Sequence, residues 1–122
     1  MPTQAIISGR EAEERACRML RSRGWRIVAR NWIGGGGELD IVASRWKTLL
    51  IVEVRLRASG TGLASVDAAK LARTRAAANA LVRSHKLQRY QLRIDVISFD
   101  GSGQHRWARD VLTIAANETT SA

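Results

Sequence analysis

The sequence contains little cysteine, few acidic residues and no long apolar run. Its single cysteine, Cys17, cannot form an internal disulfide, and its place within a helical pattern indicates a small buried side chain. No window holds about 18 consecutive apolar residues, and residues 1–8 lack the charged and then apolar segments of an export signal. Membrane insertion and export are therefore not predicted, and we expect a cytoplasmic protein.

The scarcity of acids leaves a strongly basic chain. Lys and Arg total 20 against 11 Asp and Glu, which gives a net charge of +9 and an isoelectric point near 11.4. This balance favours a polyanionic partner, and nucleic acid is the first candidate. A basic protein without a nucleic-acid role stays open, because net charge does not define a site.

Length and composition predict one globular domain. The chain has 122 residues, of which 45% are hydrophobic and 25% are charged, close to the average for soluble globular proteins. A second core has no room at this length. We expect one domain over residues 1–116, followed by a disordered polar tail over 117–122.

Hydrophobic periodicity predicts two helices and five strands. Residues 8–23 carry apolar side chains at helical spacing behind a capping residue, Ser8. The other elements are strands over 25–30, 38–43 and 49–57, a helix over 63–85, and strands over 90–99 and 104–114. A flexible four-glycine loop at 34–37 and a polar turn at 44–48 separate the first three strands. This order predicts an α/β fold, with a mixed central sheet of four or five strands flanked by helices.

Two acidic residues are predicted to meet across a hairpin. A turn of two or four residues places Asp40 directly opposite Glu53, with about 5 Å between their Cβ atoms. Like charges that face each other destabilise a sheet, which implies a positive group beside them. A divalent cation, Mg²⁺ or Mn²⁺, is one candidate, since carboxylates, water and phosphate are its usual ligands. Salt bridges to arginines such as Arg55 and Arg57 are an equally good interpretation.

Several short motifs in a fixed order resemble those of the YraN family of bacterial proteins. They are GREAE at 9–13, RN at 30–31, GELDIVA at 37–43, VEVRLR at 52–57, Val66 with Lys70, and RIDVI at 93–97. That family is similar to the restriction-endonuclease-like nucleases, whose signature is PD-(D/E)XK, and to archaeal Holliday-junction resolvases. The resemblance implies a restriction-endonuclease-like fold and a metal-dependent endonuclease that acts on DNA, with structured or branched DNA preferred.

The resemblance also implies roles for individual residues. Asp40 and Glu53 take the places of the signature acids, Arg55 takes the place of the lysine, and Glu13 matches a helix glutamate that completes the metal site. Arginine stays charged and cannot act as a base, so Lys70 is the candidate to reach the site from the second helix. The predicted catalytic set is Asp40, Glu53, Arg55 and Lys70, and the predicted metal ligands are Glu13, Asp40 and Glu53.

Further positive and aromatic side chains are candidates for binding nucleic acid. Arg57 ends the third strand, Arg73 and Arg75 lie on the second helix, and Trp46 lies in a turn where its ring can stack on an unpaired base. Two other interpretations stay open: a binding module that keeps the nuclease fold without activity, and a basic assembly protein. A homodimer is a further alternative, because a nuclease of this size often needs two copies to span two strands.

Overall fold

The computed structural model describes residues 7–57 and 68–112, which form two helices and a five-stranded sheet. The elements are α1 (Gly9–Ser22), β1 (Arg26–Gly34), β2 (Gly37–Arg45), β3 (Thr48–Leu56), α2 (Ala68–Ser84), β4 (Gln91–Phe99) and β5 (His105–Ala108). This order confirms the predicted α/β fold. The predicted tail at 117–122 and the first part of the predicted second helix, 63–67, lie outside the described residues.

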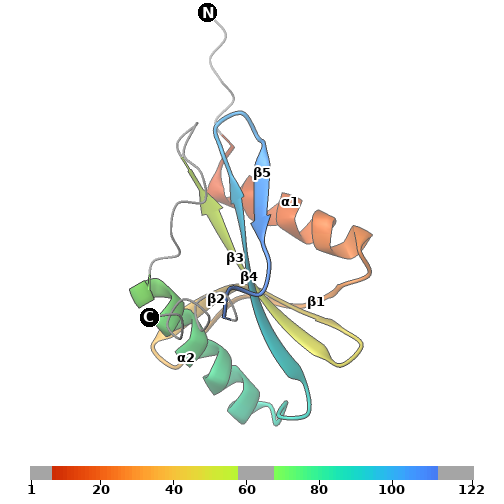
Figure 1. Ribbon diagram of the computed structural model, residues 1–122, viewed down its shortest axis with the longest axis vertical. Helices are drawn as coiled ribbons and strands as arrows, with labels where there is room; N and C mark the ends of the chain where they lie inside the picture. Colours follow the sequence, from red (N-terminus) through yellow and green to blue (C-terminus); the bar gives the residue numbers. More distant parts are fainter. Residues whose placement is uncertain (1–6, 58–67, 113–122) are drawn as a thin grey trace, which may run out of the picture.

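One mixed sheet organises the fold (Figure 1). The strands lie in the order β1-β2-β3-β4-β5, in which β1, β2 and β3 form an antiparallel meander. β4 runs parallel to β3, and β5 returns antiparallel beside β4. Parallel neighbours require a crossover connection, and α2 lies in it. At the two edges, β1 has an irregular register between Ile27 and Ala29, and β5 spans only four residues.

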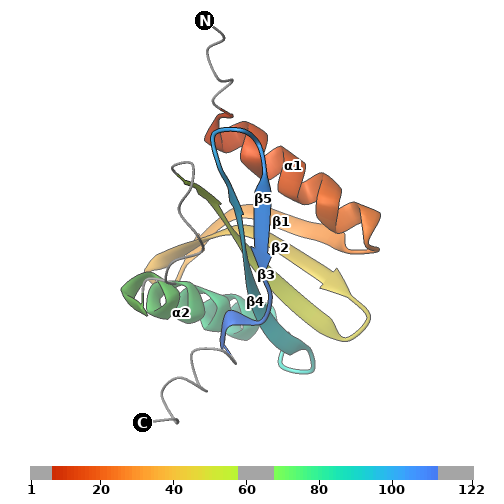
Figure 2. The ribbon, with the colours of Figure 1, turned by 45° about the horizontal axis from the view of Figure 1, so that its top comes forward.

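The two helices cover opposite faces of the sheet (Figure 2). Helix α1 begins where the side chain of Ser8 accepts a hydrogen bond from the backbone N–H of Glu11 at 3.1 Å, which confirms the predicted cap. The buried residues of the helices are Ala12, Ala16, Cys17 and Leu20 in α1 and Thr74, Ala77, Ala78 and Leu81 in α2. Both faces of the central strand β3 are therefore covered, which explains its continuous apolar run.

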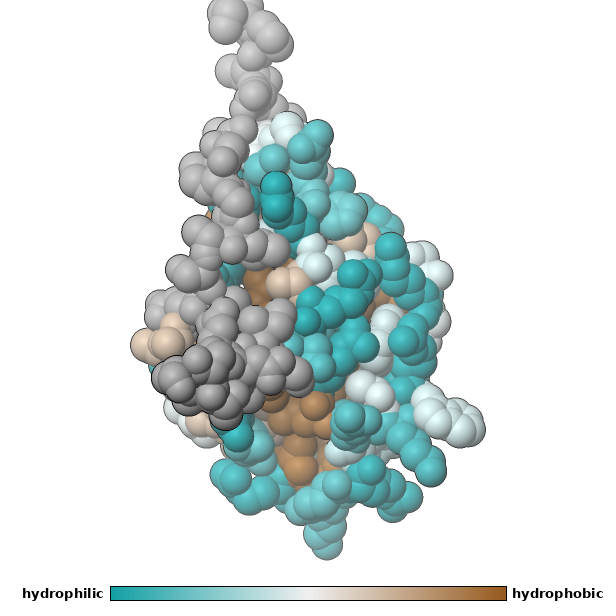
Figure 3. All heavy atoms as spheres, viewed as in Figure 1, coloured by the Kyte–Doolittle hydropathy of each residue, from teal (hydrophilic) through white to brown (hydrophobic). Residues whose placement is uncertain are grey.

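The surface of the described residues is mostly hydrophilic. In the view of Figure 3, hydrophilic side chains cover most of the described part, and hydrophobic ones show between them mainly in the lower half. The large apolar side chains that are exposed among the described residues are Val28, Ile33, Trp46 and Leu56. None of the helices in the described ranges combines the length and apolarity that crossing a membrane requires.

The four-glycine segment is a tight turn and not the predicted flexible loop. Gly34 and Gly37 pair with each other at the ends of β1 and β2, which leaves only Gly35 and Gly36 in the turn. Both turn residues have a positive φ, 59° and 83°, a region that glycine enters without strain. The strand β1 consequently extends to Gly34, four residues beyond the predicted end.

The last predicted strand, 104–114, was wrong at residues 109–112, because β5 ends at Ala108, and residues 113–114 lie outside the described part of the chain. Asp110 has a positive φ of 57°, and its backbone N–H donates to Oδ1 of Asp95 at 2.8 Å. Asp95 is fully buried, and it also accepts two hydrogen bonds from the guanidinium of Arg93 and one from the indole of Trp107. A buried carboxylate must be satisfied by donors, and this requirement turns the chain away from the sheet after β5.

Candidate metal and nucleic-acid site

The register of the β2–β3 hairpin places Asp40 beside Glu53, as the sequence predicts. The paired residues of β2 and β3 run from Arg45 and Thr48, beside the two-residue turn, to Ile41 and Val52. Asp40 and Glu53 are the next residues along the two strands. There Oδ2 of Asp40 accepts a hydrogen bond from the backbone N–H of Val54 at 2.8 Å. The Asp40 side chain thus satisfies a donor of β3 just beyond Ile41 and Val52, the last paired residues of the ladder.

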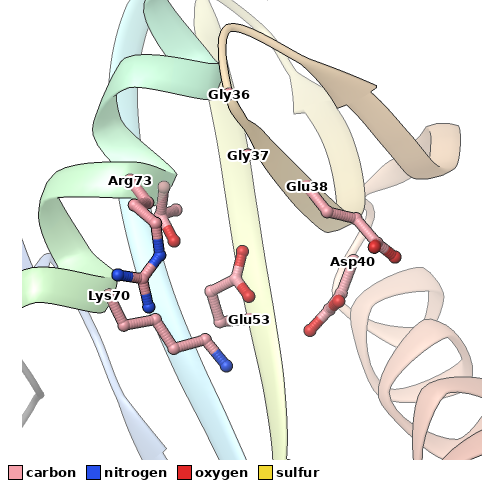
Figure 4. Close-up of a pocket in the computed structure, with 8 residues that line it drawn as sticks. Gly36, Gly37, Glu38, Asp40, Glu53, Lys70 and Arg73 are labelled. Atoms are coloured by element: carbon pink, nitrogen blue, oxygen red, sulfur yellow. The ribbon is translucent and has the colours of Figure 1, made fainter.

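Asp40 and Glu53 line one cavity of about 260 Å³ (Figure 4). The lining residues are Gly36, Gly37, Glu38, Asp40, Glu53, Lys70, Arg73 and Thr74. The acids come from β2 and β3, and the positive side chains come from α2, which faces them across the cavity (Figure 4). The side chain of Glu38 points away from Glu53 and is exposed, so β2 contributes one inward carboxylate.

Glu53 is a buried carboxylate with an incomplete set of partners. Its exposed fraction is 4%. Burial first, and then the charge of Asp40 and a hydrogen bond with the Asp40 carboxyl, raise the pKa of Glu53 from 4.5 to about 8, while the charges of Lys70 and Arg55 lower it. Among the described residues, Oε1 of Glu53 has no hydrogen-bond partner. Buried polar atoms rarely lack a hydrogen-bond partner. We therefore expect a further positive or hydrogen-bond-donating group to bind in the cavity.

Helix α2 supplies the positive side of the cavity. Lys70, Arg73 and Thr74 are spaced i, i+3 and i+4, and they therefore share the helix face that lines the cavity. Figure 4 shows Lys70 and Arg73 beside Glu53 on this side. The ion pairs found among the described residues involve neither cation. Both side chains can therefore serve an anion that enters the cavity.

Close contact between the β1–β2 turn and α2 holds the cavity in shape. A Cβ atom on Gly37 would lie 2.8 Å from the backbone oxygen of Arg73, and one on Gly35 would lie 2.8 Å from that of Ala76. Both distances are shorter than real Cβ contacts, so only glycine permits this approach. The glycine segment brings the cationic face of α2 against the strand that carries Asp40.

Glu13 and four further predicted site residues, Arg55, Arg57, Arg75 and Trp46, lie outside the cavity lining. Arg55 is half-buried on β3, and its Nε has no hydrogen-bond partner among the described residues. Arg75 is exposed on α2 next to the lining face, and Arg57 follows the end of β3. Trp46 lies in the hairpin turn before β3, at the other end of the strand.

Glu13, on α1, is held by two residues of β1. The guanidinium of Arg30 lies 3.5 Å from Oε1 of Glu13, and the side chain of Asn31 donates to the same oxygen at 3.3 Å. No group of three or more His, Cys, Asp or Glu residues suited to a metal ion occurs in the described ranges. The structure therefore brings together two of the three predicted metal ligands, Asp40 and Glu53.

Sequence reasoning missed Thr74 and the glycines Gly36 and Gly37 as lining residues. For Thr74 a signal existed, because a residue four positions after Lys70 lies on the same helix face. The same spacing rule places Arg73 on that face and Arg75 off it. The glycines gave no such signal. Their place in the cavity depends on the packing of α2 against the β1–β2 turn, which no local pattern encodes.

Comparison with known proteins identifies the family of the chain. The model of "Uncharacterised protein family UPF0102" matches residues 12–99, a range that contains both carboxylates and the cations of α2. The chain belongs to the UPF0102 family. Because YraN-like proteins form this family, the resemblance found in the sequence is confirmed.

Bacterial UPF0102 proteins align with this one along most of their length. The protein from Arthrobacter sp. (strain FB24) is 45% identical over 105 residues, which cover 82% of this chain and 89% of the relative. The protein from Myxococcus xanthus (strain DK1622) is 41% identical over 106 residues, or 84% of each chain. The protein from Ralstonia nicotianae (strain ATCC BAA-1114 / GMI1000) is 38% identical over 122 residues, 94% of this chain and 93% of the relative. The similarity thus extends well beyond the motifs of the cavity.

Proposed function

We propose that this UPF0102 protein is a metal-dependent, nuclease-like protein of the restriction-endonuclease type that acts on DNA. The observation that carries the proposal is Glu53, a buried carboxylate beside Asp40 with one oxygen that lacks a donor among the described residues. Acids on one side of a cavity and cations on the other suit phosphodiester cleavage, because the site must hold both a metal ion and a phosphate. The resemblance to restriction-endonuclease-like nucleases supports structured or branched DNA as the substrate.

The cavity fits a hard divalent cation, Mg²⁺ or Mn²⁺. Carboxylate oxygens are its preferred ligands, and Asp40 and Glu53 would hold it, with Oε1 of Glu53 available. Neither acid takes part in the ion pairs found among the described residues, which argues against the salt-bridge interpretation. When bound, such an ion activates a water molecule and stabilises the charge that develops on the phosphate.

The cations of α2 suit the phosphate side of the reaction. The amine of Lys70 can donate to a phosphate oxygen or orient a water molecule, and unlike a guanidinium it can exchange a proton. The planar guanidinium of Arg73 can bind two phosphate oxygens together. Arg55 takes the lysine position of the signature but does not line the cavity, so Lys70 is the better candidate for the role of that lysine.

Charge outside the cavity supports the choice of a long polyanion. The chain carries a net charge of +9, and among the described residues Arg75 lies on α2 and Arg57 directly follows β3. Cations on the outside of the site can neutralise phosphates on both sides of the one that enters the cavity. A small phosphorylated metabolite would not require this surrounding charge.

Cleavage of a branched DNA substrate with Mg²⁺ or Mn²⁺ tests the proposal. Asp40→Asn and Glu53→Gln keep the size of each side chain and remove its charge, and we expect both to abolish cleavage while DNA binding stays equal or becomes tighter. Glu11→Gln removes the same charge from the exposed start of α1 and should keep full activity. Cleavage that survives both cavity substitutions would overturn the assignment.

A binding module without catalysis is the second candidate. Arg55 favours it, because arginine in the place of the signature lysine cannot deprotonate water. Arg55→Lys separates the two candidates in the same assay. An increase in cleavage supports the nuclease, whereas tight DNA binding without cleavage by either protein supports the module.

A further inference from the structure

The turn between β2 and β3 carries an exposed and strained tryptophan. Trp46 is the first of the two turn residues, its φ is 55°, and it is 88% exposed. Of the two turn residues only Trp46 has a positive φ, and glycine usually holds the first position of such a turn. A bulky side chain at this φ adds strain to the backbone, and an indole that is 88% exposed gains little packing in return. Because neither property helps the chain to fold, the residue points to a function.

A second aromatic residue and two cations complete a cavity around this tryptophan. The cavity has a volume of about 430 Å³ and is lined by Trp46, Lys47, Arg89 and Tyr90. The loop before β4 is tied to the turn by a hydrogen bond of 2.8 Å from the backbone N–H of Gln91 to the oxygen of Lys47. Figures 1 and 2 both show this loop near the end of the β2–β3 hairpin. Tyr90 is half-buried against the core on the α2 side, so its ring has a fixed place.

The chemistry of the lining matches one nucleotide. Two aromatic rings can stack on a base, and two cations can neutralise its phosphate, while none of the lining residues is acidic. The volume lies within the usual range for small-ligand pockets. An acidic peptide would match the cations without using the rings, and an apolar partner would leave Lys47 and Arg89 unpaired.

This cavity is separate from the one lined by Asp40 and Glu53, and the two lie near different parts of β3. Glu53 lies five residue steps along β3 from Thr48, which is next to the turn, and this corresponds to about 17 Å. That distance is about five nucleotides of B-form rise. A single DNA molecule can therefore reach both cavities at once.

We propose that Trp46, Lys47, Arg89 and Tyr90 hold an unpaired nucleotide of a single-stranded or branched nucleic acid. The inference rests on the proposed function for its choice of nucleic acid, and it adds the class of substrate. A substrate with unpaired bases gains a contact here that a fully paired duplex cannot make, since its bases are already stacked. The strain at Trp46 is the cost of presenting the ring to that base.

The test measures binding of a fluorescent oligo(dT) of about 12 nucleotides and of a blunt duplex by anisotropy, with EDTA to exclude metal effects. Trp46→Gly should weaken oligo(dT) binding about tenfold and change duplex binding less than about twofold. Trp46→Phe, which keeps an aromatic ring, should retain most of the affinity. Ile33→Ala is the matched control, because it removes an exposed apolar side chain from β1.

Stability measurements keep the result interpretable. Trp46→Gly relieves the strained φ, so its urea midpoint should rise, and lost binding then cannot be due to unfolding. An equal loss for oligo(dT) and duplex, or no loss for either, would overturn the inference, and the second outcome would favour a protein partner. If oligo(dT) binding depends on Trp46 but Asp40→Asn leaves cleavage unchanged, the proposed catalytic site fails and the nucleotide cavity stands.

Discussion

Glu53→Gln should stabilise the protein without metal, and by an amount that depends on pH. The folded state holds the Glu53 proton up to a pKa of about 8, whereas the unfolded chain loses it near 4.5. The stabilising effect of that proton is complete below pH 4.5 and is lost as pH rises through 8, so the free energy of unfolding of the wild type falls across this window. Glutamine is neutral throughout and does not suffer this loss.

The size of the effect follows from the width of the window. Each pH unit over which only the folded state keeps the proton is worth about 1.4 kcal/mol, so the range from about pH 5 to 8 corresponds to about 4 kcal/mol. Water screens this carboxylate poorly, because Glu53 is only 4% exposed. Typical domains are stable by only about 5–15 kcal/mol, so the difference is easy to measure.

Urea unfolding in EDTA at pH 5, 6.5 and 8.5 provides the assay. The variant should be more stable than the wild type by about 4 kcal/mol at pH 8.5, and the difference should shrink toward pH 5. Glu38→Gln is the control, because it removes an exposed charge from the lining of the same cavity. If the two proteins differ little in stability and the difference does not change with pH, then burial and the charge of Asp40 do not raise the pKa of Glu53 as described.

Three further predictions concern other parts of the molecule. The affinity for duplex DNA should fall steeply with salt in titrations at two ionic strengths, since each neutralised phosphate releases counterions, and a flat response would favour the assembly-protein interpretation. Gly37→Ala should cost about 1–3 kcal/mol in urea unfolding because its Cβ would meet the oxygen of Arg73 at 2.8 Å; a neutral effect would mean that α2 can move freely. Asp95→Ala should cost about 3–5 kcal/mol by the same measurement, because it leaves Arg93 and the indole of Trp107 without their buried acceptor, and a loss below about 1 kcal/mol would contradict this role.

The parts of the fold that local chemistry determines could be predicted from the sequence. The Ser8 cap and the apolar spacing of α1 are properties of a few neighbouring residues. The pairing of Asp40 with Glu53 was also predictable, because the side-chain period of a strand is two and turns of two or four residues give the same register. Lys70 was predicted to reach the acids from α2, and it lines their cavity.

Features that depend on packing between distant segments could not be predicted. Gly37 packs against α2, more than 30 residues along the chain, and nothing near Gly37 signals that contact. The end of β5 depends on Asp95, which binds the backbone of Asp110 from another strand. The cavity at Trp46 forms because the loop that carries Tyr90 meets the hairpin turn, and this requires the parallel alignment of β3 and β4.

The outer strands of the sheet, β1 and β5, are the places where a strand of another copy could add to it. An unpaired edge strand can pair with the edge of another copy and so begin aggregation. β5 is poorly suited to this, since it offers only four residues. β1 spans nine residues and exposes Val28 and Ile33, and two irregularities interrupt it: the register shift between Ile27 and Ala29 and the positive φ of Asn31, 53°. We therefore expect that growth of the sheet from one copy into another, under conditions that loosen the fold, would start at β1.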